Sequence, residues 1–326
     1  MGKTTKPSAP RLKEILRRQD PPKLGPDYIP SIRAVREEAP SRSRATQQWS
    51  ELLLRPIHVL STPELHVCLI VLFHPRLFEL QEQRMLHYLP SPHPLEGHPK
   101  GAGEIRSALR GTLEIAEALG MLEHHATVVM PSTEPGHRGK LMPFPWVGDF
   151  LLFLEDSRGA YCVNLNVKNN ALEFLKGDQA SGKGKNSAKA AAKAKARHSI
   201  EAVYYLDGNI PTVPITTADY DKHLVANLAQ IVLWSKRVHT FAAVHERNII
   251  GYFKSAIGTR TPAIELVFNL ARINDCEVYE IKKVFYQAIW RREIRIDLFQ
   301  PLHINLPLLP ELRDPLDVYA KWFARG

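Results

Sequence analysis

The chain has 326 residues, of which 44% are hydrophobic and 24% charged, a balance typical of a soluble globular protein with room for two domains. No apolar run approaches the roughly 18 residues of a membrane-spanning helix, and the basic, proline-rich N-terminus lacks the hydrophobic segment of a secretory signal. Three cysteines lie far apart in apolar surroundings and fit neither a disulfide framework nor a zinc motif. We therefore expect a reducing, cytoplasmic location.

The net charge of +9 is concentrated in two segments. Residues 1–50 carry 11 Lys and Arg against 5 Asp and Glu, and residues 176–197 carry 7 against 1, so each segment has a net charge of +6. The rest of the chain has 25 basic against 28 acidic residues. Basic segments on a nearly neutral body are typical of contact with a polyanion, although they also serve solubility.

Residues 1–45 contain many prolines and little periodicity beyond a short helical stretch at 11–19, which predicts an arm lying across a surface or along DNA. The sequence LSTPELHVCLIVLF (60–73) predicts a helix, with Ser61 or Thr62 as its cap. A strand is expected within 74–89, followed by a loop rich in proline and glycine. GTLEIAEALGM (111–121) then predicts a helix closed by a glycine.

The next segment predicts further strands and helices of the same domain. ATVVMPS (126–132) is prone to form a strand, and residues 147–169 predict a β-hairpin around the turn Asp156-Ser157-Arg158-Gly159. A lysine-rich loop leads into an Ala/Lys-rich helix that ends at Gly208. A strand at 210–217 and an amphipathic helix at 219–236 follow, so the order of elements predicts an α/β domain on a mixed sheet.

From about residue 240 the pattern becomes helical. Residues 246–258, 261–273 and 276–299 read as three successive helices, with a strand over Glu293–Leu298. Three helices with a short strand pair are typical of a winged-helix module. We therefore expect an arm at 1–45, an α/β domain at 46–238 with a basic insertion at 176–197, and a winged-helix-like domain at 239–326.

The charged ends of the 147–169 hairpin are the strongest candidate site. Hydrolysis of a phosphodiester needs a divalent cation on oxygen ligands, a water and a positive group. One common arrangement places an acid before one strand and an acid or amide, two residues before a lysine, at the end of the next. Asp149 and the triplet Asn166-Val167-Lys168 fit it, with Asn166 and Lys168 on one face, the Val167 carbonyl as a further ligand, and Glu64 available from the preceding helix. The alternative interpretation is a solvated hairpin edge.

The sequence around this hairpin resembles the TnsA endonuclease subunit of heteromeric cut-and-paste transposases. The resemblance covers about residues 25–235 and rests on motifs that occur in the same order as in that family. They are GPDYIP (25–30), PSRSR (40–44), HVLSTPELHVCLIVLFHPRLFELQEQ (58–83), TLEIAEALGM (112–121), Asp149-Phe150, Asn166-Val167-Lys168 and SIEAVYYLDGNIPTVPITT (199–217).

The resemblance implies a restriction-endonuclease-like fold and a Mg²⁺-dependent endonuclease, with Mn²⁺ as a substitute, that cuts DNA at the 5′ ends of a transposon. Glu64 and Asp149 correspond to the family's catalytic acids, which would hold the metal together with Asn166 and the Val167 carbonyl. Lys168 would orient the attacking water. Asn166 departs from the family's longer Gln or Glu, and the lost reach of about 1 Å motivates an alternative, a catalytically weak scaffold.

The partners implied are double-stranded transposon-end DNA, a DDE-type transposase subunit and an AAA+ ATPase regulator, in a bacterial, nucleoid-associated setting. The C-terminal domain is expected to bind the regulator rather than DNA, although basic residues in it leave DNA contact open. A plain winged-helix DNA-binding protein is a third interpretation, which leaves residues 46–235 without a role.

Other polar residues are candidates for supporting the site or for contacting DNA. Gln81, Glu82 and Gln83 either support the site or are surface residues, and Glu201 is expected to form a structural ion pair. Lysines of the insertion and its helix are candidates for phosphate contacts, with a solvated loop as the alternative. These DNA-binding candidates are Lys183, Lys185, Lys189, Lys193 and Arg197.

Overall fold

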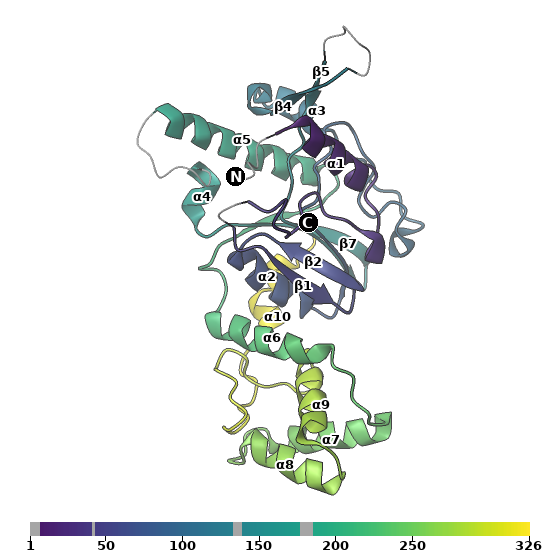
Figure 1. The fold of residues 1–326 in the computed structure, drawn as a ribbon, viewed down its shortest axis with the longest axis vertical. Coiled ribbons are helices and arrows are strands. Elements are labelled where there is room, and N and C mark those ends of the chain that lie inside the picture. Colours follow the sequence, from purple (N-terminus) through teal and green to yellow (C-terminus); the bar gives the residue numbers. More distant parts are fainter. Residues whose placement is uncertain (1–6, 41–42, 133–138, 177–184) are drawn as a thin grey trace. The chain divides into compact units, whose positions relative to one another are not determined.

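The computed structural model describes residues 7–40, 43–132, 139–176 and 185–326, and it is a mixed α/β structure, as the sequence predicts (Figure 1). The chain divides into two compact units. The first unit comprises residues 1–65, 76–219 and 321–326, and the second comprises 66–75 and 220–320. Within the described ranges, no helix combines the length and apolarity needed to cross a membrane.

The first unit is built on a four-stranded mixed sheet with the order β3-β6-β7-β8. Its strands are β3 (Leu77–Glu82), β6 (Phe150–Asp156), β7 (Gly159–Val167) and β8 (Thr212–Ile215). Strand β6 is antiparallel to β3 and β7, and β7 is parallel to β8. The predicted hairpin is confirmed as β6 and β7, and Gly159 closes its turn at a φ of +100°, which glycine adopts without strain.

One face of this sheet is covered by α3 (Thr112–Ala118) and α5 (Lys185–Leu206). Apolar side chains that alternate along the hairpin, among them Leu151 and Cys162, are buried in one cluster with Ile200 and Tyr204 of α5. Because a strand alternates its side chains with a period of two, Asn164, Asn166 and Lys168 lie on this same face. The face of β7 that packs against α5 is therefore polar toward its C-terminal end.

Two further hairpins belong to the first unit. Strands β1 (Thr46–Ser50) and β2 (Arg55–Val59) pair antiparallel, as do β4 (Thr127–Met130) and β5 (Lys140–Pro143). The predicted strand at 126–132 is confirmed as β4, whereas β1, β2 and β5 were not expected from the sequence. Short helices complete the described elements: α4 (Ala171–Lys176) and 3₁₀ turns at Gly25–Asp27, Pro99–Gly101, Leu122–His124 and Ala320–Trp322.

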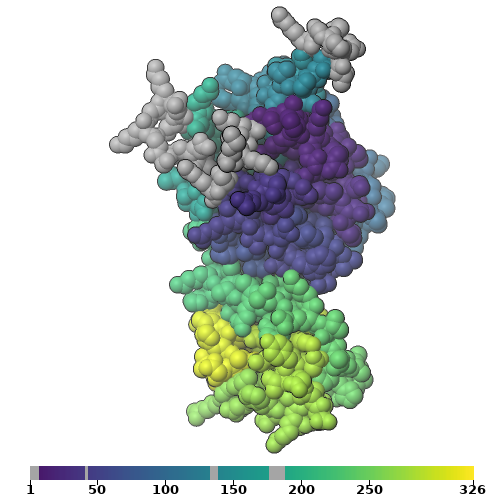
Figure 2. Space-filling model, in the orientation of Figure 1, coloured from purple at the N-terminus to yellow at the C-terminus, as the bar shows by residue number. Residues whose placement is uncertain are grey.

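The described part of the N-terminal segment is folded against the first unit (Figure 2). Helix α1 (Ala9–Gln19) buries Leu12 and Ile15 in a cluster with Met85, Val128 and Phe144. The short helix expected near 11–19 is thereby confirmed. Its apolar stripe explains why α1 forms part of the unit's core rather than lying loosely over its surface.

The second unit consists of packed helices. They are α6 (Lys222–Ser235), α7 (Ala243–Ala256), α8 (Ala263–Ile273), α9 (Val278–Trp290) and the short α10 (Pro315–Val318). The four longer helices confirm the sequence prediction, but the strand expected over Glu293–Leu298 is wrong, since Ile296 forms only an isolated bridge to Pro310. Turns on both sides of Ile296 prevent the successive backbone pairings that a strand needs.

The compact units and the expected domains divide the chain at different places. The predicted boundary lies between residues 238 and 239, whereas the second unit begins at Tyr220 and includes α6. Residues 321–326 belong to the first unit, where the Arg325 guanidinium forms an ion pair with Asp156 at 2.8 Å.

Candidate functional site

Asp149 is held at the start of β6 by backbone groups of both neighbouring strands. Its carboxylate Oδ2 accepts a hydrogen bond from the Val167 N–H at 2.8 Å, and its carbonyl accepts one from the Gln83 N–H at 2.9 Å. The side chain is only 7% exposed. Since Phe150 pairs with Leu165, the next position along the ladder brings Asp149 beside Asn166, as the sequence predicts.

Glu64 lies in the first turn of α2 (Thr62–Leu72), where it also caps the helix. Its Oε1 accepts a hydrogen bond from the Ser61 hydroxyl at 2.8 Å, and its Oε2 accepts one from the Leu60 N–H at 2.8 Å. The Glu64 N–H returns a bond to the Ser61 hydroxyl, so the sequence S-x-x-E forms a reciprocal cap. The Gln83 amide donates a further bond to Glu64 Oε2 at 3.1 Å.

The two acids interact electrostatically. Burial and the negative charge of Asp149 together raise the pKa of Glu64 to about 7, although the Leu60 and Ser61 hydrogen bonds and the Lys168 ammonium lower it. Two carboxylates that repel each other in a buried setting are arranged to accept a cation, which would replace the proton and remove the repulsion. A capping glutamate alone would not need the second acid.

The amide of Asn166 supports the same interpretation. Asn166 is 3% exposed, and its Oδ1 has no hydrogen-bond partner among the described residues. A buried carbonyl oxygen without a donor costs about 1–3 kcal/mol, which a bound ion would remove. Lys168 follows on the same face and is half-buried, and its N–H donates to the Ile215 carbonyl at 2.9 Å.

These residues fit a magnesium ion by the chemistry of their donors. Mg²⁺ is usually held by one or two carboxylates with its remaining positions filled by water or substrate oxygens. Glu64, Asp149, Asn166 and the Val167 carbonyl would supply two carboxylates and two neutral oxygens. In the part of the chain that the structure describes, no group of three or more His, Cys, Asp or Glu side chains is placed to hold a metal.

A third acid, Glu201, reaches the same region from α5. It is fully buried, its Oε1 accepts a hydrogen bond from the Asn164 amide at 3.3 Å, and its Oε2 has no partner among the described residues. Burial raises its pKa to about 7, opposed by Arg197 and reinforced by Asp149. From the sequence, a structural ion pair of Glu201 was expected in preference to a chemical role. Polar residues alternate along one face of β7, at Asn164, Asn166 and Lys168. This pattern could have indicated that the helix covering that face brings a polar residue such as Glu201 beside the site.

Gln81, Glu82 and Gln83, for which the sequence leaves both support of the site and a surface position open, are all buried. Glu82 forms an ion pair with Arg55, with both carboxylate oxygens at 2.9 Å from Nη1, and accepts from the His58 N–H at 3.0 Å. Gln83 contacts both acids of the site. The surface interpretation is therefore wrong for all three residues.

The candidate DNA-binding residues differ in their surroundings. Lys189 and Lys193 are exposed on α5, one helical turn apart. Arg197 is half-buried and donates to the Val147 carbonyl at 2.7 Å, so its guanidinium is engaged within the first unit. Lys185 begins α5, and Lys183 lies outside the described residues.

One hollow of the described surface lies away from these residues. A cavity of about 330 Å³ in the second unit is lined by α6 and the loop 301–305, and none of the residues discussed above lines it. Comparison of the chain with protein-family models found no match, and comparison with curated protein sequences found none either.

Proposed function

We propose that the first unit is a Mg²⁺-dependent DNA endonuclease, and that the protein serves as the subunit of a transposase that cuts the 5′ ends of a transposon. The observation that carries this proposal is the meeting of two repelling, buried acids, Glu64 and Asp149, with the unpartnered amide oxygen of Asn166. Lys168 follows two residues later on the same face. The mixed sheet, with an acid before β6 and the triplet at the end of β7, supports a restriction-endonuclease-like fold.

Each residue has a role in the proposed reaction. Glu64, Asp149, Asn166 and the Val167 carbonyl would hold Mg²⁺, for which Mn²⁺ would substitute. The ion would neutralise charge on the scissile phosphate and activate the attacking water. The Lys168 ammonium orients that water, and the Val167 N–H and Gln83 fix the carboxylates in place.

The proposed partners follow from charge and from the sequence resemblance. Exposed Lys189 and Lys193 would contact phosphates of transposon-end DNA, giving affinity that is independent of sequence and sensitive to salt. A DDE-type transposase subunit would cut the other strand, and the second unit would bind an AAA+ ATPase regulator. Such a complex would act in the bacterial cytoplasm at the nucleoid.

The first test is strand cleavage of a labelled duplex carrying the element's end, with the neighbouring transposase subunit and Mg²⁺, Mn²⁺ or EDTA. We expect metal-dependent cutting of the 5′-end strand. Asp149→Asn, which keeps the acceptor for the Val167 N–H, and Lys168→Ala should each reduce it by at least about 100-fold. Glu114→Gln, on an exposed position of α3, is the matched control and should cut normally.

The second candidate function is a catalytically weak scaffold that bridges DNA, transposase and regulator. It is favoured by the capping bonds that already engage both oxygens of Glu64, and by the short side chain of Asn166. If wild type, Asp149→Ala and Lys168→Ala leave the 5′-end strand equally intact in a complex that still cuts the 3′ ends, the scaffold function is correct.

A further inference from the structure

We propose that Gln83 is a positioning residue that fixes the two acids relative to each other, and that residues 28–34 of the N-terminal segment hold Gln83 in place. This inference rests on the proposed metal-dependent function and extends it, because it makes the N-terminal segment a structural part of the metal site.

Gln83 makes hydrogen bonds to both acids through different groups. Its side-chain amide donates to Glu64 Oε2 at 3.1 Å, and its backbone N–H donates to the Asp149 carbonyl at 2.9 Å. Gln83 is 4% exposed, so neither bond is shared with bulk solvent. One residue therefore links the start of α2 to the start of β6, the two elements that bring the acids together.

The backbone of Gln83 adopts a conformation that it would not keep unaided. Its φ is +48°, in the left-handed region that residues with a Cβ atom rarely occupy. Such a conformation persists where the surroundings fix it, and it is enriched at functional sites. The left-handed turn ends β3 and allows the side chain to reach Glu64 while the N–H still pairs with β6.

The groups that hold this turn come from the N-terminal segment. The Ser31 N–H donates to the Gln83 carbonyl at 3.0 Å, and the Tyr28 hydroxyl donates to the preceding carbonyl, of Glu82, at 2.7 Å. Two residues after Gln83, the Met85 N–H donates to Gln19 Oε1 at 3.2 Å. Residues 82–85 thus form three hydrogen bonds with the segment that includes α1.

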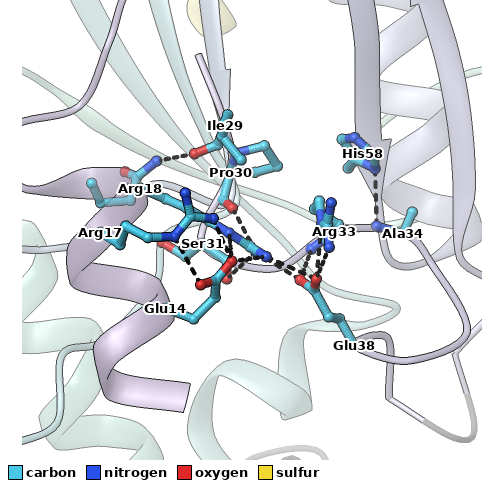
Figure 3. Close-up of polar contacts among 11 residues, drawn as sticks. Glu14, Arg17, Arg18, Ile29, Pro30, Ser31, Arg33, Ala34, Glu38 and His58 are labelled. Carbon is cyan, nitrogen blue, oxygen red and sulfur yellow. Dashed lines mark hydrogen bonds and ion pairs between the residues drawn. The ribbon is translucent and has the colours of Figure 1, made fainter. Parts of the chain in front are cut away.

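The segment is itself tied together by a network of charges, shown in Figure 3. The Arg18 guanidinium, whose side chain is 2% exposed, forms an ion pair with Glu38 at 2.7 Å and donates to the Pro30 and Ser31 carbonyls at 3.3 and 3.4 Å. Arg33 also bonds Glu38. The backbone around Ser31 is therefore anchored on both sides, and it can fix Gln83 in turn.

The test compares metal binding by full-length variants at two neighbouring glutamines. Gln83→Met removes the donor to Glu64 at nearly constant volume, whereas Gln81→Met makes the same change at a buried position that contacts neither acid. By calorimetry with Mn²⁺, we expect Gln83→Met to bind about 10–100-fold more weakly than wild type, and Gln81→Met to bind as wild type does. Thermal unfolding shows whether each variant is folded.

A milder variant keeps the test decisive if Gln83→Met fails to fold. Tyr28→Phe removes the hydroxyl that donates to the Glu82 carbonyl and leaves the ring packed, and we expect severalfold weaker Mn²⁺ binding with the same unfolding temperature within a few degrees. If Gln83→Met folds and binds Mn²⁺ with wild-type affinity, the positioning role of Gln83 is overturned, whereas the proposed function is not. A wild-type protein that neither binds Mn²⁺ nor cuts DNA would contradict the proposed function, and with it the metal site assigned to Gln83.

Discussion

His58 shows how a single buried side chain makes the stability of this protein depend on pH. Its Nδ1 accepts a hydrogen bond from the Ala34 N–H at 3.0 Å, so the imidazole must be neutral in the folded state. Burial, together with the charges of Arg55 and Arg33, lowers the pKa of His58 to about 4. The unfolded chain therefore binds a proton at His58 at a higher pH than the folded chain does.

We expect His58→Asn to make the protein less sensitive to acid. The unfolded pKa is about 6.5 and the folded pKa about 4, so the stability contributed by neutral His58 is complete above pH 6.5 and is lost as the pH falls toward 4. Asparagine keeps the acceptor for Ala34 but carries no titrating group. Between pH 7.5 and pH 5 the variant should gain about 2 kcal/mol relative to wild type in urea unfolding.

The control for this prediction is His245→Asn, at an exposed position of α7. The free energy of unfolding of His245→Asn should differ from that of wild type by the same amount at pH 7.5 and at pH 5. A constant difference for His58→Asn as well would mean that His58 is not kept neutral by its surroundings.

At the same scale, the sequence predicts most of the candidate site but not its supports. Asp149, Asn166 and Lys168 could be placed together because the period of a strand and one tight turn determine their faces. Glu64 could be placed in a first helical turn, where S-x-x-E also predicts a cap. The bond between Gln83 and Glu64 depends on a left-handed residue at the end of a strand, and nothing in the local pattern QEQ signals that.

At the scale of elements, α1 and the loop that follows it act as one structure. The loop 28–38 has no regular pairing of its own, and its geometry depends on Arg18, which reaches from α1 to Glu38. Burial raises the pKa of Glu38, but hydrogen bonds from Arg18 and Arg33 outweigh it and hold that pKa at about 2. The carboxylate is therefore charged throughout the neutral range, as the ion pair requires.

We expect Glu38→Ala to destabilise the first unit by about 3 kcal/mol, because it leaves the buried Arg18 guanidinium with only the half-exposed Glu14 as an ionic partner. Glu37→Ala removes the same type of side chain one residue earlier, at an exposed position, and should change the free energy of unfolding by less than about 0.5 kcal/mol. Chemical unfolding at pH 7 measures both. Equal effects of the two substitutions would contradict a structural role for the Arg18–Glu38 pair.

Sequence patterns predicted the elements that carry a local signal and missed those that depend on distant partners. Helices α2, α3 and α6 have caps or glycine stops, and the β6–β7 hairpin has a glycine in its turn. The hairpin β1–β2 turns instead through Leu54, which has a φ of +53°, and it contains a proline within β2. Both features argue locally against a hairpin, and burial of β2, including the Arg55–Glu82 ion pair, overrides them.

At the scale of the whole molecule, the chain passes from one unit to the other more than once. The helix α2 contributes Glu64 to the first unit, while residues 66–75 belong to the second. There the centre of the Phe73 ring lies 5.6 Å from that of Trp290 at the end of α9. The Arg292 guanidinium lies over the Phe73 ring, 5.4 Å from its centre. Residues 220–320 alone therefore lack a buried part of their own core.

We expect a fragment of residues 220–320 to unfold without a sharp transition, and a synthetic peptide of residues 62–75 to restore one. Burying a phenylalanine such as Phe73, which is 4% exposed, contributes about 3–5 kcal/mol, a large fraction of the stability of a small domain. Circular dichroism during heating, with and without the peptide, provides the measurement. The same peptide with Phe73→Ala should have no effect, and restoration by that variant would show that Phe73 is not the missing part.

The long separation in sequence of the residues at the candidate site has a consequence for protein synthesis. Ser31, Glu64, Gln83 and Asp149 leave the ribosome well before β8, whose Ile215 carbonyl accepts the bond from Lys168. At about 5–20 residues per second, translation from Ser31 to Ile215 takes roughly 10–40 s. During that interval the nascent chain contains the acids but not the strand that closes the sheet beside the lysine. An endonuclease of the proposed kind would therefore be inert while its chain is still being made, and it would become competent only once β8 has joined the sheet.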